Sequence, residues 1–283
     1  MLKYALGTAQ FGLNYGINNS RGQIPESEVG EILHLASESG IALLDTAGDY
    51  GNSEELIGRF NESSKNCFKI ITKIAGGNAQ QSLSQSLERL KVETVYGVLM
   101  HHFHDFKNNP SVWDDVECLK KAGKAQKIGF SLYYPQELEH LLHAGVRFDM
   151  VQVPYNVFDR RFEQYLKELK RQGVEIHTRS VFLQGLMFKN PQELKGHLSG
   201  ITPKINALQA MAQEHRIPLA ALAVNFCALN PMVDKVVLGI DSKDHLKTLL
   251  ESDAYRAQTQ GILNQLQQCQ EDKEALILPV NWR

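Results

Sequence analysis

Residues 41–60 read IALLDTAGDYGNSEELIGRF and form one complete strand–turn–helix unit. The run Ile41–Asp45 is short and almost entirely apolar, as expected for a parallel strand that is buried on both faces. A polar turn with two glycines follows, and the segment Ser53–Phe60 then places Leu56 and Ile57 on one helical face. The stretch therefore predicts a buried strand that leads through a tight turn into an amphipathic helix.

The same unit recurs along the whole chain. Eight strands are predicted, at Tyr4–Gly7, Ile41–Asp45, Phe68–Thr72, Tyr96–His101, Lys127–Ser131, Met150–Val153, Glu175–Arg179 and Lys235–Gly239. Helical patterns separate them, at Glu26–Ser39, Ser53–Phe60, Ser82–Leu90, Ser111–Ala122, Pro135–Ala144, Arg161–Gln172, Leu219–Leu229 and Asp244–Leu250. This alternation is typical of an α/β protein with a (β/α)8 TIM barrel, and a doubly wound open sheet is the alternative. Extra helices are expected at Pro203–Glu214 and over the C-terminal stretch Asp253–Gln270. No shift in composition marks a boundary, so residues 1–283 are expected to form a single barrel domain.

Composition excludes several classes of protein. The 30 Lys and Arg residues nearly balance the 32 Asp and Glu residues, which argues against a surface built to bind nucleic acid. No apolar run approaches the ~18 residues of a membrane span, and the N-terminus lacks a signal-peptide pattern. We therefore expect a cytoplasmic protein without a membrane partner. The four cysteines form no CxxC pair and are expected to be free thiols: Cys67, Cys118, Cys227 and Cys269.

Polar residues follow most of the predicted strands, at the end where barrel enzymes carry their active sites. In chain order they are Asp45 and Tyr50, Lys73, His101 and His102, Ser131, Gln152 and Asn156, Arg179 and Ser180, and Asp241 and Ser242. Each alone is weak evidence, because a lone polar residue there is often a helix cap. Together they predict a functional site on one face of the barrel.

The residue types suggest acid catalysis on a carbonyl group. Asp45 would keep Lys73 charged, and a charged lysine lowers the pKa of a nearby tyrosine from about 10. Tyr50 could then donate a proton to a developing alkoxide, while His101 orients the carbonyl oxygen as a hydrogen-bond donor. No G-x-S-x-G nucleophile motif occurs. Proton donation without a protein nucleophile fits reduction of a carbonyl by hydride.

With these residues in this order, the chain resembles the aldo-keto reductase superfamily. Residues 43–58, LLDTAGDYGNSEELIG, are similar to the family's signature after strand two, and ITK at 71–73 and VLMH at 98–101 match the strands with its lysine and histidine. The resemblance implies an NAD(P)H-dependent reductase with Asp45, Tyr50, Lys73 and His101 as catalytic residues. It also implies a cofactor site without a Rossmann fold, and no G-x-G-x-x-G or Walker A pattern is present.

The resemblance further indicates the residues that hold the cofactor. They are Gly7, Thr8, Asp45, Ser131, Gln152, Arg179, Ser180, Gly185, Gly239, Asp241, Ser242 and His245. Two positions depart from the family pattern. Leu132 replaces an asparagine that contacts the nicotinamide amide, and Arg179 replaces an aromatic residue that stacks on the nicotinamide. An arginine can stack as well, or it can bind an anion or form a salt bridge at the rim.

The residues that would determine the choice between NADP and NAD point in opposite directions. Asp241 takes the place of a family arginine that meets the 2′-phosphate of NADP, and a carboxylate there favours NAD. Ser242, Lys243, His245 and Lys247 lie nearby and favour a phosphate. We expect NADP(H) as the first cofactor, with NAD(H) accepted.

Two other functions stay open at this stage. A metal-dependent barrel hydrolase would use histidines such as His102 and His104, although their position after strand four does not fit the usual pattern, and no metal is expected. A non-catalytic redox sensor would keep the same fold and nucleotide. The expected substrate is a small-molecule carbonyl or alcohol, sugar-like or aryl, and the oligomeric state is left open. Candidate pocket residues are Phe11, Tyr15, Phe103, Tyr133, Tyr134, Asn156 and Phe158.

Overall fold

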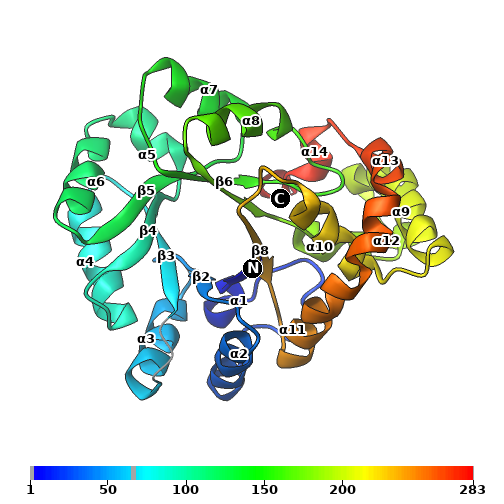
Figure 1. The fold of residues 1–283 in the computed structure, drawn as a ribbon, viewed down its shortest axis with the longest axis horizontal. Helices are drawn as coiled ribbons and strands as arrows, with labels where there is room; N and C mark the ends of the chain where they lie inside the picture. Colours follow the sequence, from blue (N-terminus) through cyan, green and yellow to red (C-terminus); the bar gives the residue numbers. More distant parts are fainter. Residues whose placement is uncertain (1–2, 65–67, 283) are drawn as a thin grey trace.

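Eight parallel strands close into a barrel in a computed structural model that describes residues 3–64 and 68–282 (Figure 1). The strands are β1 Tyr4–Gly7, β2 Leu43–Asp45, β3 Lys69–Ile74, β4 Val95–Met100, β5 Ala125–Ser131, β6 Met150–Pro154, β7 Glu175–Arg179 and β8 Lys235–Gly239. Each strand pairs with the next in the sequence, and β8 returns to β1. The predicted TIM barrel is confirmed, and the open sheet is excluded.

A ring of helices covers the outside of the barrel. Its main members are α2 Glu26–Glu38, α3 Ser53–Ser63, α4 Ala79–Leu90, α6 Val112–Lys121, α7 Pro135–His143, α8 Glu163–Arg171, α10 Leu219–Leu229 and α11 Lys243–Leu250. All eight predicted helices are found, with ends that differ by at most three residues. Short helices that the sequence did not indicate are α1 Ala9–Gly12, α5 Phe103–Asn108 and α14 Glu274–Ile277.

Alternating side chains of the strands divide the core in two. A small cluster fills the barrel interior and consists of Ala5, Leu43, Ile71, Leu99, Met150 and Val237. A much larger apolar layer lies between the strands and the helices. Because Leu43, Ile71 and Leu99 face inward, strand alternation turns Asp45, Lys73 and His101 toward the same interior.

The extra C-terminal helices lie on one side of the barrel, outside α10 (Figure 1). The predicted helix before α10 is confirmed as α9 Thr202–Glu214. The tail predicted as helical over Asp253–Gln270 does fold into helical segments, but they do not form one continuous helix. The chain there forms 3-10 turns around α12 Arg256–Gly261 and α13 Leu263–Leu266, because Ile262 has φ −114° and ψ 13°, which breaks the helical path.

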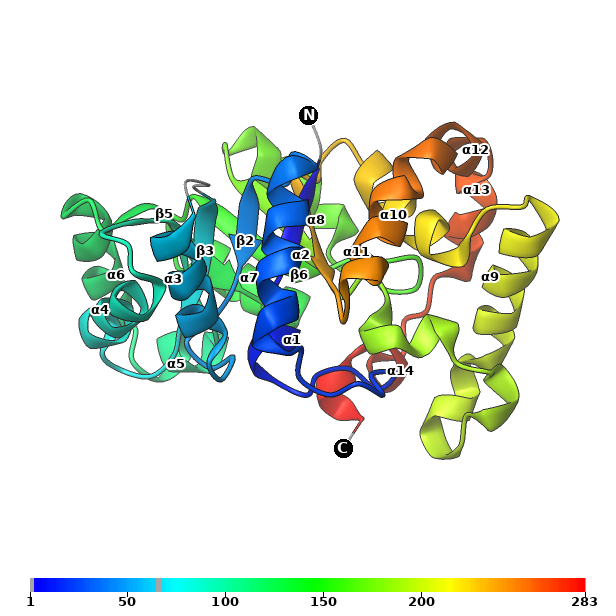
Figure 2. The same cartoon turned by 90° about the horizontal axis from the view of Figure 1, so that it is seen from below.

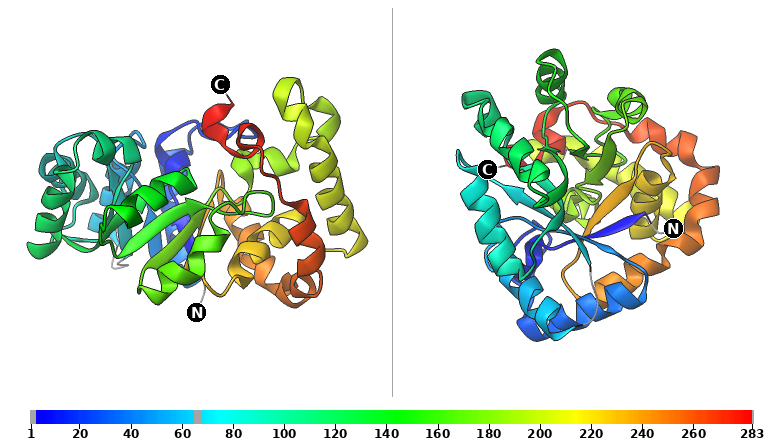
Figure 3. Two further views of the ribbon diagram at one scale, coloured as in Figure 1. Left: turned by 90° about the horizontal axis from the view of Figure 1, so that it is seen from above. Right: turned by 60° about the vertical axis from the view of Figure 1, so that its left-hand side comes forward.

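The C-terminal segment with α14 lies at the same end of the barrel as α1 and the loop after it, whereas β1 starts from the opposite end (Figure 2). Helix α11 packs beside α2, which brings the last barrel unit against the first (Figure 3). No helix in the described part of the chain is long and apolar enough to cross a membrane. Cys118, Cys227 and Cys269 are free thiols, and Cys67 lies outside the described residues.

Candidate active site

Tyr50 is held in place by a close approach of two backbone segments. A Cβ atom on Gly12 would lie 1.8 Å from the carbonyl oxygen of Tyr50, and one on Gly51 would lie 2.3 Å from the oxygen of Gly12. Gly51 also has φ +55°. Only glycine fits both positions, so α1 can press against the turn before α3 and fix the backbone of Tyr50.

The start of α3 is tied to the barrel by buried polar groups. Glu54 is 1% exposed, and its carboxylate accepts hydrogen bonds from the Thr72 hydroxyl at 2.5 Å and from Arg89 Nε at 2.8 Å. Ser53 donates to the Thr8 carbonyl at 3.0 Å. Glu54 was not predicted as a functional support, because its partners lie on β3 and α4, and no local pattern links them.

A buried ion pair lies at the base of the site. Lys73 Nζ donates to Asp45 Oδ1 at 2.6 Å and to the Thr46 carbonyl at 2.9 Å, and both charged side chains are almost fully buried. Gln152 Nε2 donates to the other carboxylate oxygen of Asp45 at 2.6 Å. Each Asp45 oxygen therefore has a donor, and the expected Asp45–Lys73 contact is present.

Tyr50 stands directly above this ion pair. Lys73 Nζ lies 5.0 Å from the centre of the Tyr50 ring. Burial alone would lower the pKa of Lys73, but the Asp45 carboxylate and Tyr50 outweigh it, and the pKa of Lys73 is raised. For Tyr50, burial is the largest effect and raises the pKa, while Lys73 only partly offsets it. The expected net lowering of the Tyr50 pKa was wrong, because the sequence reveals the lysine but not the burial.

His101 completes the group, and its ring meets Tyr50 edge-on with centres 5.7 Å apart. Burial, with positive charge from Lys73, lowers the pKa of His101 to about 2, so the ring is neutral. His101 Nδ1 lies 3.1 Å from Asp49 Oδ2. A neutral ring at this distance from a carboxylate carries its proton on Nδ1, since an unprotonated nitrogen would repel it. In this tautomer Nε2 accepts hydrogen bonds, which differs from the expectation that His101 donates one to the carbonyl.

A groove runs from these residues across the C-terminal ends of β1, β6, β7 and β8. It is lined by ten of the twelve residues that the sequence indicated for the cofactor: Gly7, Thr8, Asp45, Gln152, Arg179, Ser180, Gly185, Gly239, Asp241 and His245. The other two lie beside it: Ser131 is buried at the end of β5, and Ser242 accepts the His245 amide at 3.0 Å as the cap of α11. Tyr50 lines the inner end of the groove.

Two loops meet over the groove. Gln184 Nε2 donates to the Tyr15 hydroxyl at 3.0 Å, and a Cβ atom on Gly185 would lie 2.5 Å from that of Asn18. Ser180 and Gln184 have φ values of 62° and 53°, which are strained for residues other than glycine. Strain of this kind is common where a loop must follow a ligand.

At the outer end of the groove, the groups expected to meet a phosphate already have protein partners. Lys243 Nζ lies 2.9 Å from Glu31, and Lys247 Nζ lies 2.8 Å from Asp244. His245 Nδ1 lies 3.1 Å from Asp241 Oδ1. A 2′-phosphate would have to displace these contacts, which weakens the argument for NADP. Arg21, which was not predicted as part of the site, also lies here, and its Nη1 donates to the Asp241 carbonyl at 2.9 Å.

The Arg179 side chain packs against neighbouring residues and does not extend freely from the rim of the groove. Its guanidinium lies 4.1 Å over the Tyr133 ring and donates to the Leu132 carbonyl at 3.0 Å. In the described part of the chain, no carboxylate lies within ion-pair distance of Arg179. Its positive charge therefore remains available to the groove.

The seven residues expected around the substrate either are buried in the loops or line one of two grooves. Phe11, Asn156 and Phe158 are fully buried and pack the loops. Tyr15 lines the cofactor groove, and Phe103, Tyr133 and Tyr134 line a second groove next to His102. About half of the expected set thus lies on the surface above the site.

Comparison with known proteins agrees with this geometry. The model of the Aldo/keto reductase family matches residues 3–270. The Uncharacterized oxidoreductase YqkF of Bacillus subtilis is 23% identical, covering 94% of this chain and 96% of its own, and the chloroplastic Pyridoxal reductase of Arabidopsis thaliana is 25% identical over 78% and 71%. The structure of aldo-keto reductase AKR11C1 from Bacillus halodurans, a holo form, superposes with a TM-score of 0.74 at 20% identity, covering 97% and 95% of the two chains. The chain therefore belongs to the aldo/keto reductase family.

Proposed function

We propose that this protein reduces a small-molecule aldehyde or ketone to an alcohol with NAD(P)H, and that Tyr50 is the proton donor. The observation that carries this proposal is the convergence of Tyr50, His101 and the Asp45–Lys73 pair at the inner end of one groove. When bound, the nicotinamide supplies the hydride. A carbonyl whose oxygen lies against Tyr50 then needs one proton, which the phenol can give.

The residues of the groove fit a dinucleotide in shape and chemistry. Gly7, Gly185 and Gly239 line the groove without side chains of their own, and Gln152 and Ser180 offer polar groups at the inner end. The charge of Arg179 favours a ligand that carries phosphates. These residues would hold the cofactor along the ends of β1, β6, β7 and β8, with its reactive ring toward Tyr50.

Each catalytic side chain has a distinct task in this proposal. Lys73 stabilises the phenolate that Tyr50 becomes after donation, and Asp45 keeps Lys73 charged. His101 lies edge-on against Tyr50 and, by this contact, would limit where the carbonyl group can lie. The aromatic surface of Phe103, Tyr133 and Tyr134 favours an aryl or sugar-like carbonyl as substrate.

We take NADP(H) as the first cofactor, as is common in the family, and expect weak discrimination because the basic groups near Asp241 are already paired. The test compares kcat/KM for NADPH and NADH. A preference for NADH above about a hundredfold, roughly 2.7 kcal/mol, would show that Asp241 determines the choice and that this order is wrong.

The decisive experiment follows NAD(P)H oxidation with a panel of aryl and sugar-like aldehydes. Turnover that persists with a strong chelator supports a reductase over a metal-dependent hydrolase. Cofactor binding without turnover on any carbonyl would instead support a non-catalytic redox sensor.

A further inference from the structure

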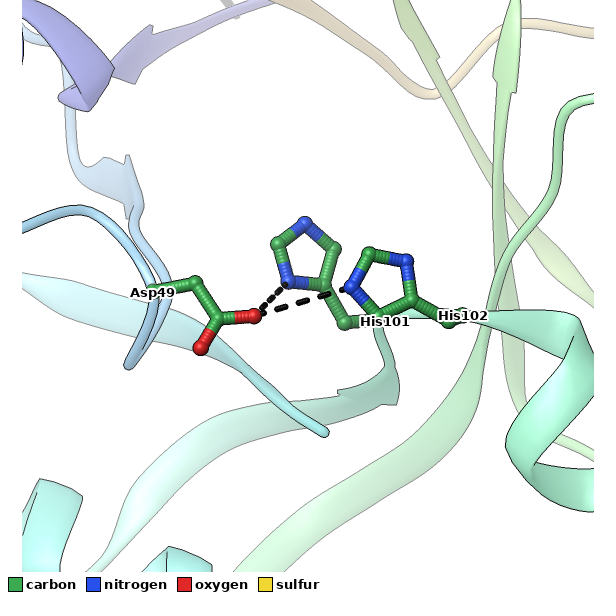
Figure 4. Close-up of side chains that lie close together, drawn as sticks. All are labelled: Asp49, His101 and His102. Carbon is green, nitrogen blue, oxygen red and sulfur yellow. Dashed lines mark hydrogen bonds and ion pairs between the residues drawn. The ribbon is translucent and has the colours of Figure 1, made fainter. Parts of the chain in front are cut away.

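Three side chains at the mouth of the site meet in a way that the reductase chemistry does not use. Asp49 Oδ2 lies 3.1 Å from His101 Nδ1 and 3.6 Å from His102 Nε2 (Figure 4). The ligand atoms of all three residues fall within 4.8 Å of one another. Two imidazoles and one carboxylate are the donor set that borderline divalent cations such as Zn²⁺ prefer.

We propose that Asp49, His101 and His102 form a binding site for Zn²⁺ or a similar first-row divalent ion, and that its occupation inhibits the enzyme. The binding site does not depend on the proposed function, whereas the inhibition rests on it.

The spacing of the donors fits such an ion. A Zn²⁺ ion bonds nitrogen and oxygen at about 2.0–2.2 Å, which separates neighbouring ligands of a tetrahedral site by about 3.4 Å. The two measured separations from Asp49 lie on either side of that value. Three protein ligands leave a fourth position for water or another small ligand.

The two outer side chains, Asp49 and His102, must turn for the three ligands to meet one ion, and the site permits this. The His101 and His102 rings are nearly parallel, with an angle of 12° and centres 4.4 Å apart, so their lone pairs do not yet converge. The side chains of His102 and Asp49 are 38% and 53% exposed, whereas that of His101 is 11% exposed. His101 can therefore stay in place while the two outer ligands turn toward a shared ion.

The position of the three ligands determines how an ion reaches the site and how it would affect catalysis. His102 lines the second groove, beside Phe103 and Tyr133, so an ion can reach the site from solvent. Once bound, the ion takes the place of the proton on Nδ1 of His101, the neutral ring carries its proton on Nε2 instead, and the ion adds positive charge next to Tyr50. His101 then cannot adjust its protonation or orientation to a carbonyl substrate, and reduction slows.

The test titrates the whole wild-type protein with ZnCl₂ in a calorimeter, in a buffer that does not bind zinc. We expect one ion per chain, and His102→Ala and Asp49→Asn should each weaken binding at least about tenfold, the lower end of what losing even an outer-shell partner costs. His104→Ala is the matched control, because His104 stacks on His102 but pairs with Asp105 instead. It should bind as the wild type does.

Co²⁺ provides a second readout, because its visible absorption bands report nitrogen and oxygen ligands directly and need no enzymatic activity. We also expect Zn²⁺ to inhibit NAD(P)H oxidation by the wild type and to inhibit His102→Ala at least about tenfold less strongly. Absence of saturable binding, binding unaffected by both variants, or loss of binding in His104→Ala would each overturn the site. If the wild type reduces no carbonyl, the proposed function fails, while the calorimetry still decides whether the metal site exists.

Discussion

Replacing Lys73 by methionine tests the electrostatic part of the mechanism. The ammonium lies 5.0 Å from the centre of the Tyr50 ring. At an effective dielectric constant of about 20, the attraction between a lysine and a phenolate at that separation is about 3 kcal/mol. If all of it acts on the transition state, Lys73→Met lowers kcat by about a hundredfold.

The pH dependence of the rate shows in which direction Lys73 shifts the pKa of Tyr50. The positive charge of Lys73 favours the phenolate and so opposes the effect of burial on the pKa of Tyr50. Without it, the pKa of Tyr50 rises further, and the alkaline limb of kcat/KM, where Tyr50 must be protonated, moves to higher pH. The assay is NAD(P)H oxidation with one reducible aldehyde across the alkaline range.

Two companion variants make the result specific. Lys73→Met leaves the Asp45 carboxylate buried without its partner, so the double variant with Asp45→Asn removes both charges and guards against simple unfolding. Lys69→Met is the matched control, because Lys69 lies on the same strand, 4.8 Å over Tyr96, at the other end of the barrel. An alkaline limb that stays in place in Lys73→Met, or that moves equally in Lys69→Met, would refute the argument.

The remaining predictions concern the histidines and the closed end of the barrel. His101→Ala should lower kcat for carbonyl reduction far more than His102→Ala, and steady-state kinetics showing the reverse ranking would mean that the catalytic register is off by one residue. Glu175 accepts hydrogen bonds from His177 and Tyr96 at 2.6 and 2.7 Å; burial would raise its pKa, but these bonds and Lys127 lower it. Glu175→Gln should therefore reduce the free energy of unfolding at pH 7 by about 3 kcal/mol. The stability that Glu175 provides is complete above its unfolded pKa of about 4.3 and is lost as the pH falls below it, so urea unfolding of the variant should depend less on pH in that range. Glu168→Gln, which breaks an exposed pair with Arg171, should cost much less than Glu175→Gln, and equal losses for the two variants would contradict the assignment.

The barrel was predictable because its signal is repeated. Each strand is an apolar run and each helix a periodic stripe, so an error of one or two residues at an end, as in β3, leaves the order intact. The group that we propose as catalytic could be predicted for the same reason, since strand alternation turns Asp45 and Lys73 to the same side. The break in the C-terminal helical segment at Ile262 could not be predicted, because the apolar pattern of the sequence continues through it unchanged.

What the sequence could not provide depends on contacts between distant residues or on burial. Asp49 lies in a turn without periodicity, one residue before Tyr50, and its meeting with His101 becomes visible only when β4 is placed beside the turn. Glu54 looks like an ordinary acidic residue in the first turn of a helix until Thr72 and Arg89 surround it. The direction of the Tyr50 pKa needed the degree of burial, which no local pattern encodes.

The most direct test of the central claim is the turnover of Tyr50→Phe. The substitution removes one hydroxyl group and keeps the ring between Lys73 and His101. If Tyr50 donates the proton, kcat for carbonyl reduction should fall by about 10²–10⁴, while the dissociation constant for NAD(P)H, measured by fluorescence titration, stays close to that of the wild type. A Tyr50→Phe variant that binds the cofactor normally and keeps most of its turnover would contradict the account.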